Sequence, residues 1–140
     1  FDFINYLQKK DVTLSLPEID TINNSMNFKK WKLFDKLING PFGTMEPPKY
    51  QTSILPQILV VPMLSFDKEL YRLGYGGGYY DKSITILKKH FKKERKFFIT
   101  IGLAYSIQEE KKIPKEKHDM KLDYIITEKE VLSNFNQKKY

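Results

Sequence analysis

The stretch Arg72-Leu-Gly-Tyr-Gly-Gly-Gly-Tyr-Tyr-Asp81 is the most informative part of this chain about its fold, because it places four of the seven glycines between two segments of regular pattern. Before it, the continuous apolar run at residues 58–63 is typical of a buried strand, and after it residues 80 to about 93 have the pattern of a helix. Glycine lets the backbone adopt positive φ and approach a ligand closely, and a helix N-terminus attracts anions through its unpaired N–H groups. The stretch therefore predicts a phosphate-binding loop.

The rest of the pattern predicts an α/β fold. Apolar runs at residues 97–104 and 122–126 predict two more buried strands. Weaker signals predict a helix at 2–10, strands at 12–16 and 26–33, a helical option at 33–39, and a last short helix that starts with a capping box at 127–130 and ends near residue 135. Continuous apolar strands that alternate with helices favour a sheet covered on both faces. We expect a single α/β domain over residues 1–140, with a mostly parallel sheet, helices on both faces and a Rossmann-like three-layer architecture.

The composition limits the function classes. The 140 residues suit one domain, and a hydrophobic fraction of 41% indicates a globular chain. The absence of cysteine excludes disulfides and thiolate metal sites and is compatible with a reducing cytoplasm. No apolar run reaches the ~20 residues of a membrane span, and the first residues lack a signal-peptide pattern. Because the first residue is Phe1, we expect the chain to begin inside a larger protein.

The net charge of +7 raises the question of nucleic-acid binding. Much of the excess lies at residues 88–96 and in the lysine tail at 138–139. Lysines at a helix C-terminus interact favourably with the helix dipole and stay solvated, and they can also attract anionic substrates. A nucleic-acid surface would spread over a face, and nothing in the sequence requires one. We therefore expect neither a nucleic-acid partner nor a membrane partner.

The glycine stretch does not match the two standard phosphate-binding motifs. A dinucleotide fingerprint requires glycine where Tyr79 stands, and a P-loop requires glycine before Lys-Ser, where Asp81 stands. A simple glycine-rich hairpin remains an alternative. Arg72, however, supplies a forked cation suited to phosphate oxygens, and Asp81 in the first helical turn could hold magnesium. Tyr75, Tyr79 and Tyr80 offer flat faces and hydroxyl groups to an aromatic ligand, or they pack in the core.

The loop and its surroundings resemble one family closely. Val61-Pro-Met-Leu-Ser-Phe-Asp67, followed by Tyr71-Arg-Leu-Gly-Tyr-Gly-Gly-Gly-Tyr-Tyr-Asp81, is similar to the signature of 5-formyltetrahydrofolate cyclo-ligase, also called methenyltetrahydrofolate synthetase. Gly40-Pro-Phe-Gly-Thr-Met-Glu-Pro47 resembles the family's glycine-Glu-Pro segment. His118-Asp-Met-Lys-Leu-Asp123 resembles its C-terminal Asp-x-x-x-Asp entry to a strand. The similarity extends from about residue 12 to about residue 126.

The resemblance implies an enzyme that uses ATP and Mg²⁺ to convert 5-formyltetrahydrofolate, with or without a polyglutamate tail, into 5,10-methenyltetrahydrofolate, ADP and phosphate. ATP would phosphorylate the formyl oxygen, N10 of the folate would attack the same carbon, and phosphate would leave. Such phosphoryl transfer requires mainly positioning and charge stabilisation from the protein. Family members begin with a helix whose Lys and Arg reach ATP, followed by a strand and a substrate-binding Glu, and these parts have no counterpart here. We expect a cytoplasmic monomer whose domain is N-terminally incomplete and whose binding of ATP and folate is weakened.

The resemblance also implies roles for individual residues. The catalytic residues would be Arg72, Tyr79 and Asp81. The ATP-binding residues would be Arg72, Gly74, Tyr75, Gly76, Gly77, Gly78, Tyr79 and Tyr80. The folate-binding residues would be Phe42, Met45, Glu46, Tyr75, Gly76, Gly77, Gly78 and Tyr79. Asp81 and Asp119 would hold magnesium, whereas Asp123 is expected to be structural and Phe66 to pack in the core.

Two other function classes remain open at this point. A sugar-phosphate isomerase or CoA-transferase-like relative would need a general base near the loop, but His90 lies in a basic helix and His118 in a charged loop. A non-catalytic basic nucleotide- or nucleic-acid-binding module would show a steep salt dependence of its oligonucleotide affinity. Saturable magnesium–ATP binding that is lost in Arg72→Ala would favour the enzyme.

Overall fold

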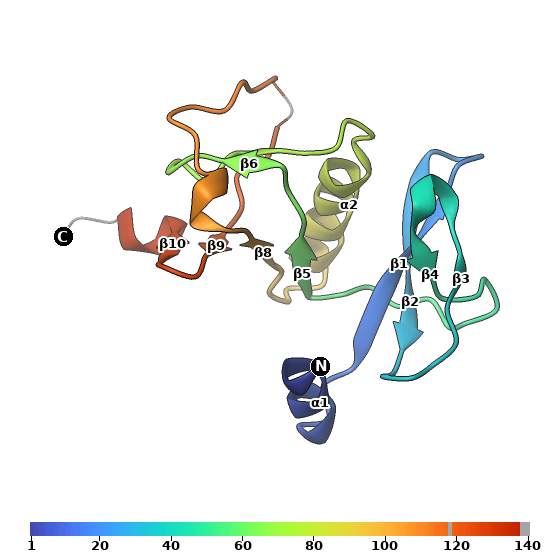
Figure 1. The fold of residues 1–140 in the computed structure, drawn as a ribbon. Coiled ribbons are helices and arrows are strands. Elements are labelled where there is room, and N and C mark those ends of the chain that lie inside the picture. The colour runs from blue at the N-terminus through green and yellow to red at the C-terminus, as the bar shows by residue number, and fades with distance from the viewer. Residues whose placement is uncertain (118, 138–140) are drawn as a thin grey trace. The chain divides into compact units, whose positions relative to one another are not determined.

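The computed structural model describes residues 1–117 and 119–137. His118, which opens the 118–123 motif, and the predicted lysine tail therefore lie outside the described residues. The chain divides into two compact units, residues 1–56 and residues 57–140, and each is described by itself. Figure 1 shows the course of the chain through both units. Of the helices described, none has the length and apolar character needed to cross a membrane.

The first unit is built on an antiparallel pair of strands. Helix α1 (Asp2–Lys9) precedes β1 (Leu14–Asp20), which pairs with β2 (Ser25–Trp31) in a register that sets Leu14 opposite Trp31. Asp20 closes the connecting turn, because its Oδ1 accepts hydrogen bonds from the backbone N–H groups of Ile22 at 3.0 Å and Asn23 at 3.1 Å. These elements confirm the predicted helix at 2–10 and strand at 26–33, and the strand predicted at 12–16 extends to residue 20.

The rest of the first unit contains no helix of the predicted kind. The helical option for residues 33–39 is wrong: Phe34 has a φ of +74°, and the N–H of Lys32 donates to Asp35 Oδ2 at 2.9 Å, which closes a turn instead. A small antiparallel pair comes next, made of β3 (Ile38–Asn39) and β4 (Met45–Glu46), with the 3₁₀ turn η1 (Pro41–Gly43) between them.

The second unit is an α/β unit around a four-stranded sheet in the order β10-β9-β8-β5. Strand β5 (Ile58–Val61) is parallel to β8 (Ile99–Leu103), and β8 is parallel to β9 (Tyr124–Ile126). Strand β10 (Val131–Ser133) is antiparallel to β9 at the edge. Helix α2 (Tyr79–Lys93) lies between β5 and β8 in the sequence, as the helical pattern at residues 80–93 predicted.

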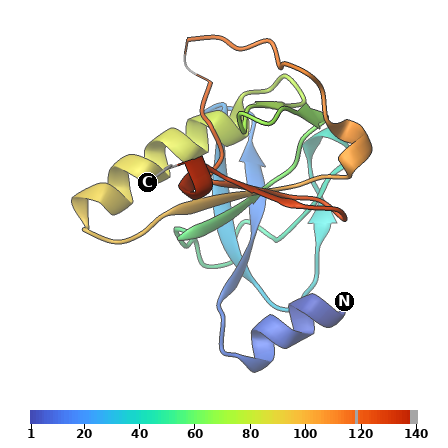
Figure 2. The same ribbon diagram turned by 90° about the vertical axis from the view of Figure 1, so that its left-hand side faces the viewer.

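Helix α2 packs on the sheet through a narrow apolar stripe. Its buried apolar residues are Ile84, Leu87 and Phe91. The ring of Phe91 stacks on that of Phe98, just before β8, with the ring centroids 6.0 Å apart. Two turned views show the helix running beside the sheet (Figures 1 and 2). In β5, Leu59 and Val61 are buried, whereas Ile58 and Val60 are 51% and 49% exposed, so only alternate residues of this apolar run are buried.

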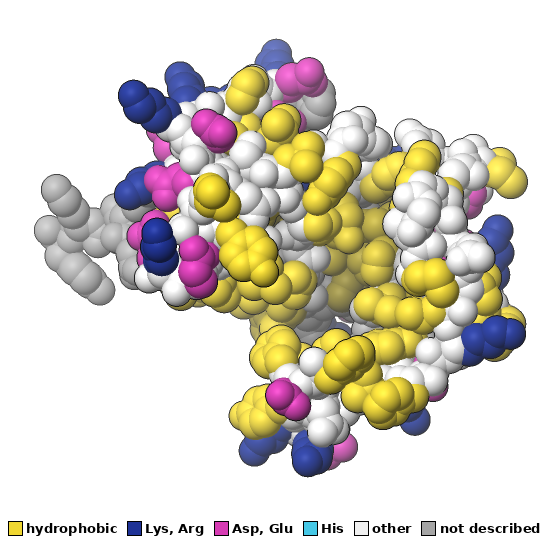
Figure 3. Space-filling view, viewed as in Figure 1, with side chains coloured by type: hydrophobic (Ala, Val, Ile, Leu, Met, Phe, Trp, Pro, Cys, Tyr) yellow, Lys and Arg dark blue, Asp and Glu magenta, His cyan; other side chains and the backbone are white. Residues whose placement is uncertain are grey.

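The expected architecture is therefore confirmed only as α/β. The four-stranded sheet is mixed. The described pairs β1–β2 and β3–β4 are antiparallel, as is the pair of β6 (Ser65–Phe66) with β7 (Arg72–Leu73), so a mostly parallel arrangement is not confirmed. Among the described residues of the second unit, α2 is the only α-helix, so helices on both faces are not seen there either. The apolar composition of β5 suggested burial on both faces, but the alternation of exposure shows burial on one. Figure 3 shows apolar surface on the face in view.

The helix predicted after residue 127 is wrong. Thr127 Oγ1 does accept hydrogen bonds from the N–H groups of Lys129 and Glu130, at 3.2 and 3.1 Å, as a capping residue would. The N–H of Thr127, however, donates to the carbonyl of Glu130 at 2.9 Å and closes a hairpin between β9 and β10. The same capping chemistry stabilises a tight turn here, and the short 3₁₀ helix η3 (Asn134–Gln137) comes only after the strand.

Glu128, in this turn, gives a first prediction. Its carboxylate accepts hydrogen bonds from the hydroxyl and the backbone N–H of Ser106, and the hydroxyl bond is the larger cause of a lowered pKa of Glu128, below the usual 4.5. A carboxyl group whose pKa is lower in the folded state than in the unfolded state stabilises the folded state at pH values above the unfolded-state pKa. This stabilisation is lost as the pH falls through the folded-state pKa. Glu128→Gln is expected to lower the melting temperature at pH 7 and to leave it unchanged near pH 2. Equal shifts at both pH values would contradict this, and Glu94→Gln serves as the charge-matched control.

Candidate functional site

The glycine loop connects a small hairpin to α2. Strands β6 (Ser65–Phe66) and β7 (Arg72–Leu73) pair with Phe66 opposite Arg72, a hairpin that the sequence pattern did not reveal. Gly76 and Gly78 have φ values of +96° and +69°, which favour glycine, and a Cβ added at either would meet nothing within 4 Å. Gly78 is the N-cap of α2, and no side chain caps this end. The loop thus presents open backbone at a helix N-terminus.

Arg72 is held beside this loop in a buried position. Its side chain is 5% exposed, and its Nη2 lies 3.2 Å from Asp81 Oδ1 in the first turn of α2. Its Nη1 donates to the carbonyl of Pro62 at 3.4 Å, and its Cζ lies 5.9 Å from the ring centre of Tyr80. Burial raises the pKa of Tyr80, and the charge of Arg72 opposes that shift. Arg72 Nε is buried without a hydrogen-bond partner among the described residues, which leaves one donor for a ligand.

Close packing explains the other two glycines of the loop. A Cβ added at Gly74 would lie 2.7 Å from Arg72 Nη1, and one added at Gly77 would lie 2.7 Å from Tyr79 Cδ2. A larger residue at either position would require the neighbouring side chain to shift, so these glycines are favoured by contact rather than by backbone conformation. The loop packs tightly against the Arg72 side chain on one side and is open at Gly76 and Gly78 on the other. Tyr75 projects outward and is 72% exposed.

The two candidate magnesium ligands are both engaged in other contacts. Asp81 is ion-paired with Arg72, and Asp119 Oδ2 accepts a hydrogen bond of 2.7 Å from the N–H of Glu116. Within the described part of the chain, no three His, Cys, Asp or Glu residues cluster in a way that could hold a metal ion. Magnesium is commonly held by one or two carboxylates together with phosphate oxygens and water. These residues therefore fit magnesium only as a companion of a bound phosphate. Asp123 is structural, as expected, because its Oδ2 accepts bonds from Thr100 N and Oγ1 at 2.9 and 3.0 Å.

The predicted folate-binding residues Phe42, Met45 and Glu46 belong to the first unit. Phe42 and Met45 are 76% and 54% exposed, so both offer apolar surface to a ligand. Glu46 differs, because it is 6% exposed and its Oε1 accepts a hydrogen bond of 3.1 Å from the N–H of Ile19 in β1. The observed contacts of Glu46 hold β4 against β1. Phe66, at 0% exposure, packs in the core of the second unit as expected.

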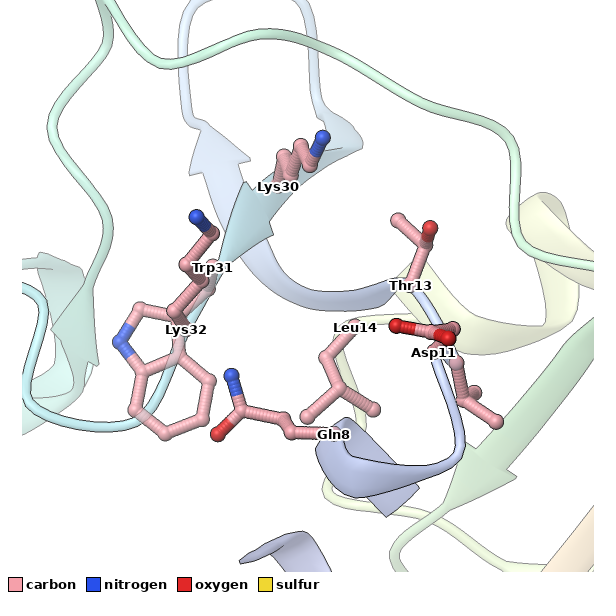
Figure 4. Close-up of a pocket in the computed structure, with 8 residues that line it drawn as sticks. Gln8, Asp11, Thr13, Leu14, Lys30, Trp31 and Lys32 are labelled. Atoms are coloured by element: carbon pink, nitrogen blue, oxygen red, sulfur yellow. The ribbon is translucent and has the colours of Figure 1, made fainter.

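A pocket in the first unit was not anticipated from the sequence. Its volume is about 350 Å³, and none of the predicted site residues lines it (Figure 4). Its lining residues come from the end of α1, the start of β1 and the end of β2: Gln8, Asp11, Val12, Thr13, Leu14, Lys30, Trp31 and Lys32. Trp31 Nε1 is buried without a hydrogen-bond partner among the described residues. The alternation Lys-Trp-Lys at the strand end is the only sequence signal that could have pointed to it.

The fold and the loop define a class: an α/β protein in which a glycine loop and a buried arginine lie at a helix N-terminus, an arrangement suited to an anionic ligand. Comparison with known proteins makes this specific. The chain belongs to the 5-formyltetrahydrofolate cyclo-ligase family, whose pattern matches residues 2–128, and this confirms the resemblance carried by the motifs.

Individual relatives agree with this assignment. The chain is 38% identical to the 5-formyltetrahydrofolate cyclo-ligase of Haemophilus influenzae over 85 residues, which are 58% of this chain and 42% of the relative. It is 31% identical to the probable 5-formyltetrahydrofolate cyclo-ligase of Schizosaccharomyces pombe over 116 residues, 74% of this chain and 57% of the relative. The solved structure of 5,10-methenyltetrahydrofolate synthetase from Aquifex aeolicus matches with a TM-score of 0.74 and 28% identity, over 99% of this chain and 66% of that one. The chain thus spans about half the length of these curated relatives.

Proposed function

We propose that this chain is the part of an ATP- and Mg²⁺-dependent cyclo-ligase that holds the ATP phosphates and one side of the folate. The full reaction would convert 5-formyltetrahydrofolate into 5,10-methenyltetrahydrofolate with release of ADP and phosphate. Membership of the family supports the reaction, and one structural observation supports its location. That observation is the buried Arg72, ion-paired to Asp81 and left with an unpartnered Nε beside an open glycine loop.

The chemistry asks the protein to bind and orient rather than to attack. Phosphoryl transfer to the formyl oxygen would turn this oxygen into a leaving group when N10 of the folate closes the ring. For this transfer, the backbone N–H groups of residues 74–80 and the Arg72 guanidinium would neutralise phosphate oxygens. Tyr79, the first residue of α2, would contribute to the binding of the ATP phosphates. Since Arg72 is already fixed by Asp81 and Pro62, it would lose little side-chain entropy on binding.

The remaining site roles are part of the same proposal. Asp81 and Asp119 would share a magnesium ion with the phosphates, and Asp81 would then exchange part of its contact with Arg72 for the metal. Phe42 and Met45 would offer exposed apolar surface to the pterin, and Tyr75 of the second unit would contact the folate as part of the glycine loop. Glu46 would act on the folate only through the position of β4, because its carboxylate is buried.

The test combines binding with turnover. Magnesium–ATP binding to the chain is measured by calorimetry, and methenyltetrahydrofolate formation is measured by absorbance with and without Mg²⁺. Saturable binding and an ATP-dependent product are the expected results. Asp81→Asn is expected to retain ATP binding in the absence of metal and to lose most of the gain that Mg²⁺ provides. Undiminished turnover of Asp81→Asn would exclude the metal role, and oligonucleotide binding with a steep salt dependence, without ATP binding, would favour the nucleic-acid module instead.

We also propose a Rossmann-like three-layer architecture for the second unit. The apolar side chains of Ile58, Val60 and Leu103, each about half exposed at 51%, 49% and 51%, form the kind of sheet face that a second helical layer covers. The variant Val60→Lys tests this architecture. Its free energy of unfolding is expected to fall if a helical layer covers the face, and an unchanged value would show that the face is open to solvent.

A cytoplasmic, monomeric enzyme without nucleic-acid or membrane partners completes the proposal. It is supported by a chain that contains no cysteine and by a net charge of +7 of which much lies at residues 88–96, near the end of α2. Sedimentation equilibrium tests the oligomeric state, and a mass of twice 16.6 kDa would overturn it.

A further inference from the structure

The turn that joins β6 to β7 is organised by one buried carboxylate, Asp67. Asp67 is 2% exposed, and none of the described residues forms a salt bridge with it. Asp67 Oδ1 accepts hydrogen bonds from the N–H groups of Glu69 at 3.0 Å and Tyr71 at 3.2 Å. Its Oδ2 accepts a third, from the N–H of Ile113 at 2.9 Å, 46 residues further along the chain. One carboxylate therefore serves two segments that are far apart in sequence.

The same two segments are joined on either side of Asp67. The N–H of Glu110 donates to the carbonyl of Phe66 at 2.8 Å, and the N–H of Leu122 donates to the carbonyl of Leu70 at 3.0 Å. Leu70 has a φ of +73°, a conformation that costs a leucine free energy and that these contacts maintain. Phe66, Leu70 and Leu122 are 0–1% exposed, so the junction is closed to solvent.

The two joined segments carry the two halves of the candidate metal–phosphate site. The turn at residues 67–71 leads directly into Arg72 and the glycine loop. The other segment carries Asp119 between its anchors at Ile113 and Leu122. If the two segments shifted relative to each other, the candidate magnesium ligand Asp119 would move relative to Arg72.

We infer that Asp67 is a positioning residue that fixes the Asp119 segment relative to Arg72 by holding Ile113 and the β6–β7 turn on one carboxylate. For the roles of Arg72 and Asp119 this inference rests on the proposed function. The bonds of Asp67 themselves do not depend on it. Asp67 touches no reacting group and acts through the backbone that it holds.

Asparagine at this position separates the two tasks of the carboxylate. Asn has one acceptor oxygen and one NH₂ group, so it cannot accept bonds on both sides. With its oxygen turned toward Glu69 and Tyr71, it keeps two bonds and sets a donor against the Ile113 N–H. The opposite orientation keeps one bond and loses two. We therefore expect Asp67→Asn to preserve the turn and to release Ile113.

The first test follows backbone amide hydrogen exchange and needs no activity. In Asp67→Asn, the Ile113 amide is expected to lose roughly 10- to 100-fold of its protection, while the Tyr71 amide keeps its own relative to global stability. Leu87→Ala is the matched control, because it weakens the α2 core at a site that is 2% exposed and lies outside the junction. It should lower the protection of Ile113 and Tyr71 together. An Ile113 amide that is unaffected by Asp67→Asn overturns the inference.

The second test asks whether this frame serves the metal. Asp67→Asn is expected to raise the Mg²⁺ concentration needed for half-maximal ATP binding about tenfold, a size typical of groups that orient metal ligands. Metal-free ATP binding through Arg72 should change little. If Asp67→Asn weakened metal-free ATP binding and the effect of Mg²⁺ to the same extent, as expected for Leu87→Ala, the result would indicate general destabilisation and overturn the positioning role.

These outcomes separate the inference from the proposed function. If the wild-type chain binds no magnesium–ATP, the proposed function fails while the exchange experiment still decides whether Asp67 joins the segments. If Asp67→Asn does not fold, the wild-type chain suffices: Ile113, Glu69 and Tyr71 amides should exchange through one shared opening. Ile113 exchange as fast as that of its exposed neighbours would overturn the inference.

Discussion

Arg72→Ala is expected to lower turnover roughly 10²- to 10³-fold and to abolish measurable magnesium–ATP binding, because it removes a preorganised cation from the phosphate site. The arginine is 5% exposed and holds Asp81, which is 31% exposed, at 3.2 Å. Its loss leaves that carboxylate unpaired at the start of α2. Since Asp81 is partly solvated, the free energy of unfolding should fall only about 1–3 kcal/mol, less than for a fully buried pair. The effect on binding should therefore exceed the effect on folding.

Two variants make this result interpretable. Arg72→Lys keeps the charge but loses the forked geometry and the contacts at Pro62 and Asp81 together, so activity should recover only in part. Lys68→Ala removes the same charge from the neighbouring turn, where Lys68 lies 3.8 Å from Glu109 on the surface, and should leave binding unchanged. Magnesium–ATP affinity of Arg72→Ala within threefold of the wild type would exclude Arg72 from the phosphate site.

Leu122→Ala is expected to cause the largest loss of stability, about 2–5 kcal/mol in the free energy of unfolding of the second unit, measured by urea titration with circular dichroism. Leu122 is 0% exposed and lies where the 110–122 segment meets the sheet. Its side chain packs against Gly102 in β8, so truncation leaves a cavity under the strand. Ile86→Ala, on α2 with 55% exposure, is the control and should cost far less.

A double mutant tests the contact itself. A Cβ added at Gly102 would lie closest to Met63 Cε, then 2.8 Å from Leu122 Cδ1 and 3.3 Å from Ile125 Cγ1, so Gly102→Ala alone should cost about 1–3 kcal/mol by overpacking. In the Leu122→Ala background the added methyl group gains room on the Leu122 side, and only the flexible end of Met63 must still shift. The combined loss should therefore be smaller than the sum of the single losses by roughly 0.5 kcal/mol or more. Additive losses would show that the two residues do not compete for this space.

The local sequence pattern was sufficient to predict those helices and strands whose formation depends mainly on their own residues. The helix at Tyr79–Lys93 and the strands at Ile58–Val61, Ile99–Leu103 and Tyr124–Ile126 lie where apolar spacing predicts them, because burial of one face stabilises each. The loop at residues 74–78 was also predictable from local sequence, because clustered glycines favour a loop over a helix or a strand. Signals whose outcome depends on strand pairing were ambiguous. Thr127 has a capping side chain in either case, and pairing with β9 made residues 131–133 a strand.

Residue identities at fixed short spacings were enough to establish the family and the α/β class, and they also predicted a glycine loop between a strand and a helix. The folded chain was needed to show how the apolar runs are buried, that Glu46 holds β1, and that Asp67 joins the turn before Arg72 to the segment that carries Asp119. The reason is physical. A carboxylate such as Asp67 has the same local pattern whether it faces solvent or accepts a bond from a residue 46 positions away, and only folding brings that partner within hydrogen-bonding distance.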